Sequence, residues 1–114
     1  MDLQVDLMKK LFTEALRASA KAREVLSKKM PDRQNEFIAA AYMNKAISSM
    51  SAARVYYHSN LDELNNSVVD DLFREFDNLT DEFLSCLAEH HSHQWTEEAY
   101  NTILDLMKII GISL

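Results

Sequence analysis

The chain of 114 residues is long enough for one domain with a single hydrophobic core, and we expect residues 1–114 to form that domain. One Gly and one Pro in this length disfavour a sheet joined by tight turns, and a single cysteine excludes an internal disulfide. The net charge of −6 argues against DNA or RNA as the main ligand, because phosphate contacts need clustered Lys and Arg side chains.

The first segment, residues 3–29, has the apolar periodicity of an amphipathic helix. Its predicted buried stripe advances in steps of three and four and consists of Met8, Leu11, Phe12, Ala15, Ala18, Ala22, Val25 and Leu26. Pro31 ends this helix, since a proline moves the residue before it out of the α region. Asp32 then has the side chain to cap the next helix, and so short a connection makes the two helices antiparallel neighbours.

A second helix is predicted for residues 33–58. Its predicted buried stripe consists of Phe37, Ala40, Ala41, Asn44, Ile47, Ser48, Ser51 and Val55. Alanine and serine are frequent throughout the segment, so this helix has little side-chain bulk and can approach its neighbours closely. We therefore expect it to be central in the fold.

A third helix is predicted from residue 61 to residue 89 or 90. Asn60 and Glu63 have the spacing of a capping box at its start, with Asn in place of the usual Ser or Thr. Its predicted stripe consists of Leu61, Leu64, Val68, Leu72, Phe76, Leu79, Phe83 and Leu87.

Residues 90–95 are polar and predict a loop, after which Thr96 is the predicted cap of a fourth helix. The predicted stripe of that helix consists of Tyr100, Ile103, Leu104, Met107 and Ile110. Gly111 fits a C-cap in the left-handed conformation, with Ile112 folding back as in a Schellman motif. This helix is the shortest of the four, so apolar surface of the first or second helix is expected to be exposed beyond its end.

Long amphipathic helices joined by short loops predict an all-α fold, an antiparallel, up-down-up-down four-helix bundle. Charge is divided between its halves, because residues 1–60 carry ten Lys or Arg against six Asp or Glu, whereas residues 61–114 carry two against twelve. The halves therefore attract each other, and the acidic half also offers a surface for a basic partner. No stretch is long and apolar enough to span a membrane and the N-terminus has no signal pattern, so we expect a cytoplasmic protein that does not bind membranes.

One cluster has the residue types of a metal site: Cys86, His90 and His93. Cys86 and His90 are four residues apart and would share a helical face, and zinc accepts such ligands. A structural zinc site needs four ligands, however, and the chain has no second cysteine and no Glu-x-x-His motif of the kind that bundles use for paired metals. We expect no metal or other cofactor, and metal binding by the segment from Cys86 to His93 stays the weakest alternative.

Motifs for catalysis are not met either. Gly111 is the only glycine, so the chain has neither a Gly-rich phosphate loop nor a nucleophile elbow. Arg54 and His58 are residue types used by the small helical nucleases of the HEPN class, but their spacing is too short for that motif. We instead expect Arg54 to reach an acidic side chain of the third helix.

Four aromatic residues fall off the predicted stripes, and we predict them as partner-binding residues: Tyr42, Tyr56, Phe73 and Trp95. The alternative is that they pack at the flanks of their helices. Together with the divided charge and the missing catalytic motifs, they predict a non-catalytic protein–protein interaction module of adaptor, chaperone or inhibitor type.

In layout the chain is similar to the flagellin export chaperones, which are small acidic four-helix bundles that hold the helices of a partner. It is similar in the same way to acidic helical immunity proteins that block basic nucleases. The resemblance implies that another protein is the partner. The alternative is a homo-oligomeric structural or ligand-binding bundle, in which a second copy of the chain covers the exposed apolar stripe.

Overall fold

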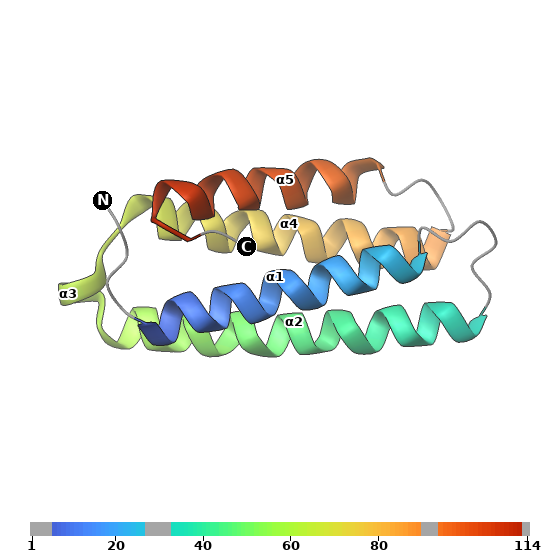
Figure 1. The fold of residues 1–114 in the computed structure, drawn as a ribbon, viewed down its shortest axis with the longest axis horizontal. Coiled ribbons are helices and arrows are strands. Elements are labelled where there is room, and N and C mark those ends of the chain that lie inside the picture. Colours follow the sequence, from blue (N-terminus) through green and yellow to red (C-terminus); the bar gives the residue numbers. More distant parts are fainter. Residues whose placement is uncertain (1–5, 27–32, 90–93, 113–114) are drawn as a thin grey trace.

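The computed structural model describes residues 6–26, 33–89 and 94–112, drawn as coloured ribbon in Figure 1. These ranges are almost entirely helical, and no described segment forms a strand. The helices are α1 (Asp6–Leu26), α2 (Arg33–Ser59), α3 (Leu61–Leu64), α4 (Ser67–Glu89) and α5 (Gln94–Ile109). The predicted all-α fold is therefore confirmed.

The four long helices form an elongated bundle of 46 × 21 × 21 Å. Figure 1 shows that α1 and α4 run in one direction and that α2 and α5 run back in the other, so the predicted up-down-up-down order is confirmed. None of the described helices has the length and apolar character that crossing a membrane would require.

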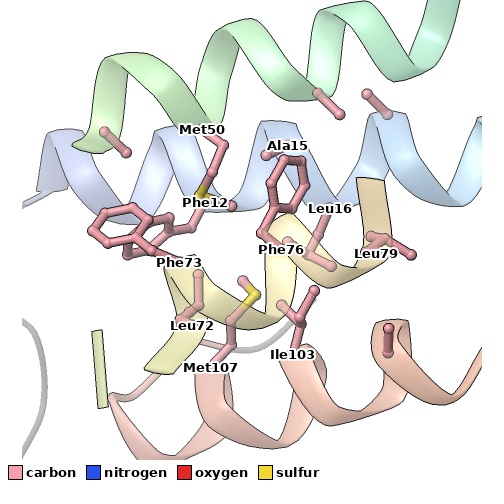
Figure 2. Close-up of a cluster of buried hydrophobic side chains, with 14 of the residues drawn as sticks. Phe12, Ala15, Leu16, Met50, Leu72, Phe73, Phe76, Leu79, Ile103 and Met107 are labelled. Carbon is pink, nitrogen blue, oxygen red and sulfur yellow. The ribbon is translucent and has the colours of Figure 1, made fainter. Parts of the chain in front are cut away.

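The core lies between these four helices and has large side chains from α1, α2, α4 and α5. Phe12 of α1 meets Phe73 of α4 edge to face, with ring centroids 5.6 Å apart. Figure 2 shows this part of the core, with labelled side chains from all four long helices. The largest side chains that are almost completely buried are Tyr57, Phe12, Phe83, Met8, Leu16, Met50, Leu72, Leu79, Ile103, Met107, Ile110 and Val69.

The bundle consists of two hairpins of different character. Close approaches between Cα atoms are most frequent between α1 and α2, fewer between α4 and α5, and sparse between α2 and α4. The α1–α2 hairpin buries small side chains, which lets the two backbones approach: Ala15, Ala18, Ser19, Ala22, Ala39, Ala46 and Ala53. The expected close approach of α2 to a neighbour is thus confirmed for α1.

The predicted buried stripe of α2 is wrong. The buried side chains of α2 are Ala39, Met43, Ala46, Met50, Ala53 and Tyr57, and none of them was in the predicted stripe. Phe37 and Val55 are instead exposed, and only Ile47 of the predicted set is packed against the core as a large side chain. The physical reason is that Ala and Ser occur on every side of this helix, so its periodicity does not identify the buried face. Because one side of α2 is exposed along its length, the expectation that it is central is also wrong.

The third predicted helix is interrupted, giving α3 and α4. Asn60 makes no side-chain cap bond, so the predicted capping box is wrong, and its Nδ2 instead donates to the Tyr56 carbonyl (2.9 Å). The cap is formed six residues later, where the Asn66 Oδ1 accepts a hydrogen bond from the Val68 backbone N–H (2.8 Å) and starts α4. Val69 rather than Val68 is then fully buried.

The end of α5 matches the prediction, whereas its start does not. α5 begins at Gln94, so Thr96 lies inside the helix and is not its cap. At the other end Gly111 has a φ of 88°, the Ile112 N–H donates to the Met107 carbonyl (2.9 Å), and the Gly111 N–H donates to the Lys108 carbonyl (3.1 Å). This pair of bonds is the Schellman motif, which is confirmed. Pro31 and Asp32 lie outside the described residues.

Candidate functional site

The structure describes the side chains of three of the four predicted partner-binding aromatics, and one of these three lies in the core. Tyr42 is exposed on α2, and Tyr56 is half-buried against the core. Trp95 lies within α5, but its side chain is outside the described part of the structure. Phe73 is only 5% exposed, so it belongs to the core and its assignment to a partner-binding surface is corrected.

Phe73 is held in the core from several sides. Its ring lies 5.6 Å from the Tyr57 ring and 5.6 Å from the Phe12 ring, both in edge-to-face geometry. The guanidinium of Arg54 covers the ring at 5.1 Å from its centroid. The prediction missed Phe73 because the buried side of α4 is wider than the predicted stripe, so Leu72 and Phe73 are both buried.

Arg54 joins α2 to α4, as the sequence predicted. Its Nη2 donates to the Phe73 carbonyl (3.1 Å) and to the Asp77 Oδ1 (3.0 Å). Both side chains of this ion pair are partly exposed to solvent, so the attraction between them is screened. His58 lies one turn after Arg54 on α2, and its ring centroid is 6.4 Å from that of Phe73, so both side chains lie against Phe73.

The connection between α2 and α4 is fixed by Tyr57. Its hydroxyl donates to the Asn66 carbonyl (3.1 Å) and accepts from the Asn66 N–H (2.9 Å). Burial raises the pKa of the Tyr57 hydroxyl above its usual range, the hydrogen bond from Asn66 opposes this rise, and the nearby charge of Asp70 adds to it. Tyr57 is therefore a neutral structural residue that anchors the start of α4.

A second tyrosine joins α1 to α5. The guanidinium of Arg23 lies over the Tyr100 ring, 4.7 Å from its centroid. Burial raises the pKa of Tyr100, and the positive charge of Arg23 lowers it in part. This contact is also structural, since it holds the two hairpins together on the side of the bundle opposite Arg54.

A hollow lies in the seam between α2 and α4, where the two hairpins have few close approaches. We define this α2–α4 seam by the residues that line the hollow: Ile47, Met50, Ser51, Arg54, Phe76, Asp77 and Thr80. Its apolar part comes from Ile47, Met50 and Phe76, and the ion pair of Arg54 with Asp77 closes one end. The hollow has the shape to receive an apolar side chain from outside the bundle.

Beside the seam lies an uncharged, exposed stripe of α2, which we call the α2 outer face. Its members follow one another in steps of four and three: Phe37, Ala41, Asn44, Ser48, Ser51 and Val55. All six are exposed, and the large apolar side chains at its two ends are 71% exposed at Phe37 and 67% exposed at Val55. The buried stripe from Ala39 to Tyr57 has the same spacing, shifted by two residues, so the buried and the exposed stripe lie on opposite sides of α2.

Leu84 extends this apolar surface onto α4. It lies four residues after Thr80 and seven after Asp77, and both of these line the seam, so Leu84 lies on the same side of α4. Its side chain is 55% exposed. The α2 outer face, the seam and Leu84 thus form one surface that spans two helices from different hairpins.

Sequence reasoning missed this surface because it assigned Phe37 and Val55 to the core. A signal was present: α2 has two stripes of identical spacing, and only one of them can face the bundle. Met43, Met50 and Tyr57 repeat every seven residues on the stripe that is buried, whereas serine and asparagine occupy the other.

The predicted metal site cannot be assembled from what the structure describes. Cys86 lies in α4, but its side chain is not among the described ones, and His90 and His93 lie outside the described residues. Within ranges 6–26, 33–89 and 94–112, no three His, Cys, Asp or Glu side chains gather in a way that could hold a metal ion. Metal binding by the segment from Cys86 to His93 stays a prediction, and near-stoichiometric zinc in dialysed protein is the result that it requires.

Comparison with known proteins identifies no relative: no family model, no curated protein and no solved structure matches the chain. The likeness in layout to flagellin export chaperones and immunity proteins therefore contributes no argument about a partner. What supports a function is the surface itself.

Proposed function

We propose that this protein is a non-catalytic protein–protein interaction module that binds another protein through the α2 outer face and the adjoining seam. The observation that carries the proposal is the exposure of Phe37 and Val55 on one side of α2, with no charged residue at the stripe positions between them. Burying each of these side chains would contribute about 1–2 kcal/mol, which is free energy that the isolated bundle does not gain.

The form of the surface supports a helical partner. The α2 outer face extends from Phe37 to Val55, or about 27 Å of helix, with steps of four and three that match the ridges of a second helix. Ala41, Asn44, Ser48 and Ser51 are small, and small side chains allow two helix backbones to approach closely, as α1 and α2 do in the bundle.

A cytoplasmic location is part of the proposal. Its support is the single cysteine of the chain, since the fold then requires no oxidising compartment to form disulfides. The bundle is instead stabilised by a core that all four long helices share.

The second candidate is a homo-oligomer, and the same exposed stripe favours it, because a second copy would bury it by two-fold symmetry. Sedimentation velocity at micromolar concentration separates the two candidates. A monomer supports a different protein as the partner, whereas a dimer that is lost in Phe37→Ser supports the homo-oligomer.

The experiment that tests the proposal compares the proteins that the tagged chain recovers from an extract of its source cells. Wild type and Leu7→Ser, which changes an exposed leucine on α1, are expected to recover the same partner. The variant with Phe37→Ser and Val55→Ser is expected to lose it while melting at the same temperature. A partner retained equally by all three proteins, or no partner above background, contradicts the proposal.

A further inference from the structure

We infer that the occupant of the α2–α4 seam is an amphipathic helix of another protein, with Lys or Arg along one flank of its apolar stripe. The inference rests on the proposed function and names the chemistry of the partner. The seam offers apolar contacts along its length, and the charge on its two sides is unequal.

The apolar part of the site lies in a row across two helices. Val55 is at one end, the hollow with Ile47 and Phe76 is in the middle, and Leu84 lies one helical turn beyond Thr80. These positions alternate between α2 and α4, so a helix lying lengthwise over the seam would contact both. One of its apolar side chains would fill the hollow between them.

The charge on the two sides of the seam is unequal. On α4, Asp70 and Asp77 are seven residues apart and Asp81 follows four residues later, so they follow one side of the helix, and all three are exposed. Asp77 lines the seam itself, and Asp70 lies two turns before it on the same side of α4, so these two carboxylates follow the α4 border of the seam. Asp81 also lines a hollow between α4 and α5, on the side away from the seam. On the other side, the stripe positions of the α2 outer face are uncharged. A helix in the seam would thus meet negative charge on one flank only.

Arg54 neutralises part of Asp77, since its Nη2 bonds the Oδ1 of that carboxylate. Asp70 interacts with the neutral hydroxyl of Tyr57, so its negative charge is not neutralised by that contact. Residues 61–114 carry two basic against twelve acidic residues, so the approach of a basic helix is favoured over the whole half of the chain that contains α4.

The same charge argues against a second copy as the occupant. Each copy has a net charge of −6, so two copies repel each other as they approach. A basic helix is instead attracted to the negatively charged chain. Complementary charge also determines specificity, because an acidic helix with the same apolar stripe would be repelled by the α4 border.

The test uses two synthetic helical peptides of about 18 residues, long enough to span the α2 outer face. They share one leucine stripe and differ only in their flanking residues, which are Lys in one and Glu in the other. Fluorescence anisotropy of labelled peptide measures binding to the full chain at low and physiological salt. We expect the Lys peptide to bind at least about tenfold more tightly than its Glu twin, and to weaken as salt rises.

Two matched pairs of variants locate the site. Leu84→Ser is expected to weaken binding of the Lys peptide about tenfold, while Leu7→Ser, an exposed leucine of α1, leaves it unchanged. Asp77→Asn is expected to weaken it, while Asp105→Asn on α5 leaves it unchanged. Melting temperatures of the four variants exclude unfolding as the cause.

Several outcomes overturn the inference, and they differ from failure of the proposed function. Equal binding of both peptides, or equal loss in both members of a variant pair, shows that the seam does not select a basic helix. Tight binding of the Glu peptide that is lost in Leu84→Ser overturns the charge of the partner and leaves the proposed function intact. Absence of binding by either peptide overturns the helical occupant, and a dimer that Leu84→Ser dissociates assigns the seam to a second copy.

Discussion

The two hairpins of the bundle contribute different kinds of side chain to their shared core. The α1–α2 hairpin buries seven Ala and Ser residues and has the closest backbones, while α4 and α5 bury Phe, Leu, Ile and Met and approach less often. Close backbones need small side chains, so the Ala and Ser positions between α1 and α2 have no room for larger ones. The second hairpin is stabilised by the packing of large apolar side chains, and truncating one of them leaves a cavity. The two hairpins should therefore fail in opposite ways when they are changed.

The largest effect is expected from truncation in the second hairpin. Phe83 of α4 is almost completely buried, and Phe83→Ala is expected to lower the free energy of unfolding by about 3–5 kcal/mol. Leu84→Ala is the neighbouring control and should cost less than about 1 kcal/mol, because that side chain is exposed. Urea denaturation measures both, and similar losses would contradict the assigned burial.

The second largest effect is expected when a buried side chain of the first hairpin is enlarged. Ala46 of α2 is fully buried, and Ala46→Leu is expected to cost about 1–3 kcal/mol, because the added volume would separate α1 from α2. Ala41→Leu makes the same change on the α2 outer face and should alter the free energy of unfolding by less than about 0.5 kcal/mol. If both variants unfold at the same urea concentration, the close packing of the first hairpin is refuted.

The joint between the hairpins should be less sensitive. Tyr57→Phe removes a hydroxyl that bonds both backbone groups of Asn66, and we expect a loss of about 1–2 kcal/mol by urea denaturation. Tyr56→Phe is the control, since the Tyr56 hydroxyl makes no hydrogen bond to Asn66, which Tyr57 anchors. A loss in Tyr56→Phe as large as that in Tyr57→Phe would show that Asn66 is not anchored in this way.

The same residue predicts a dependence on alkaline pH. Burial raises the pKa of Tyr57 above the usual value of 10.0, so above that value the unfolded chain loses its proton first. The stability that Tyr57 contributes is therefore complete below pH 10 and declines as pH rises towards the higher pKa of the folded protein. Tyr57→Phe should show a smaller decline, and an unchanged decline would contradict a buried, neutral Tyr57. The remaining decline has a second source, because the pKa of Tyr100 is raised as well.

What the sequence could predict differs between α2 and the other three long helices. The stripes of α1, α4 and α5 have large apolar residues at regular spacing, so their helices, their antiparallel order and the Gly111 cap were predictable. The buried side of α2 was not, because alanine and serine occur around the whole helix and the choice depends on which neighbours fill the space. The break before α4 was missed for a related reason, since Asn60 and Asn66 both have side chains that can cap a helix and only the packing of Tyr57 selects Asn66.

The sequence did not predict the candidate surface, because it predicted the wrong buried side for α2. The sequence predicted a protein-binding module and assigned the binding to Tyr42, Tyr56, Phe73 and Trp95, of which Phe73 is buried. It assigned Phe37 and Val55, which are exposed, to the core. An aromatic residue directly beside a predicted stripe is a weak signal for a surface position, because a buried helix face can be wider than the stripe. The more informative signal was a second stripe of equal spacing on one helix.

The central claim is that α2 packs into the bundle through the stripe from Ala39 to Tyr57 and leaves the opposite side free for a partner. Urea denaturation of the double variant Phe37→Ser and Val55→Ser tests it most directly. Because both side chains are exposed, we predict a free energy of unfolding within about 0.5 kcal/mol of wild type. A loss of about 3 kcal/mol or more would place these side chains in the core and contradict the account.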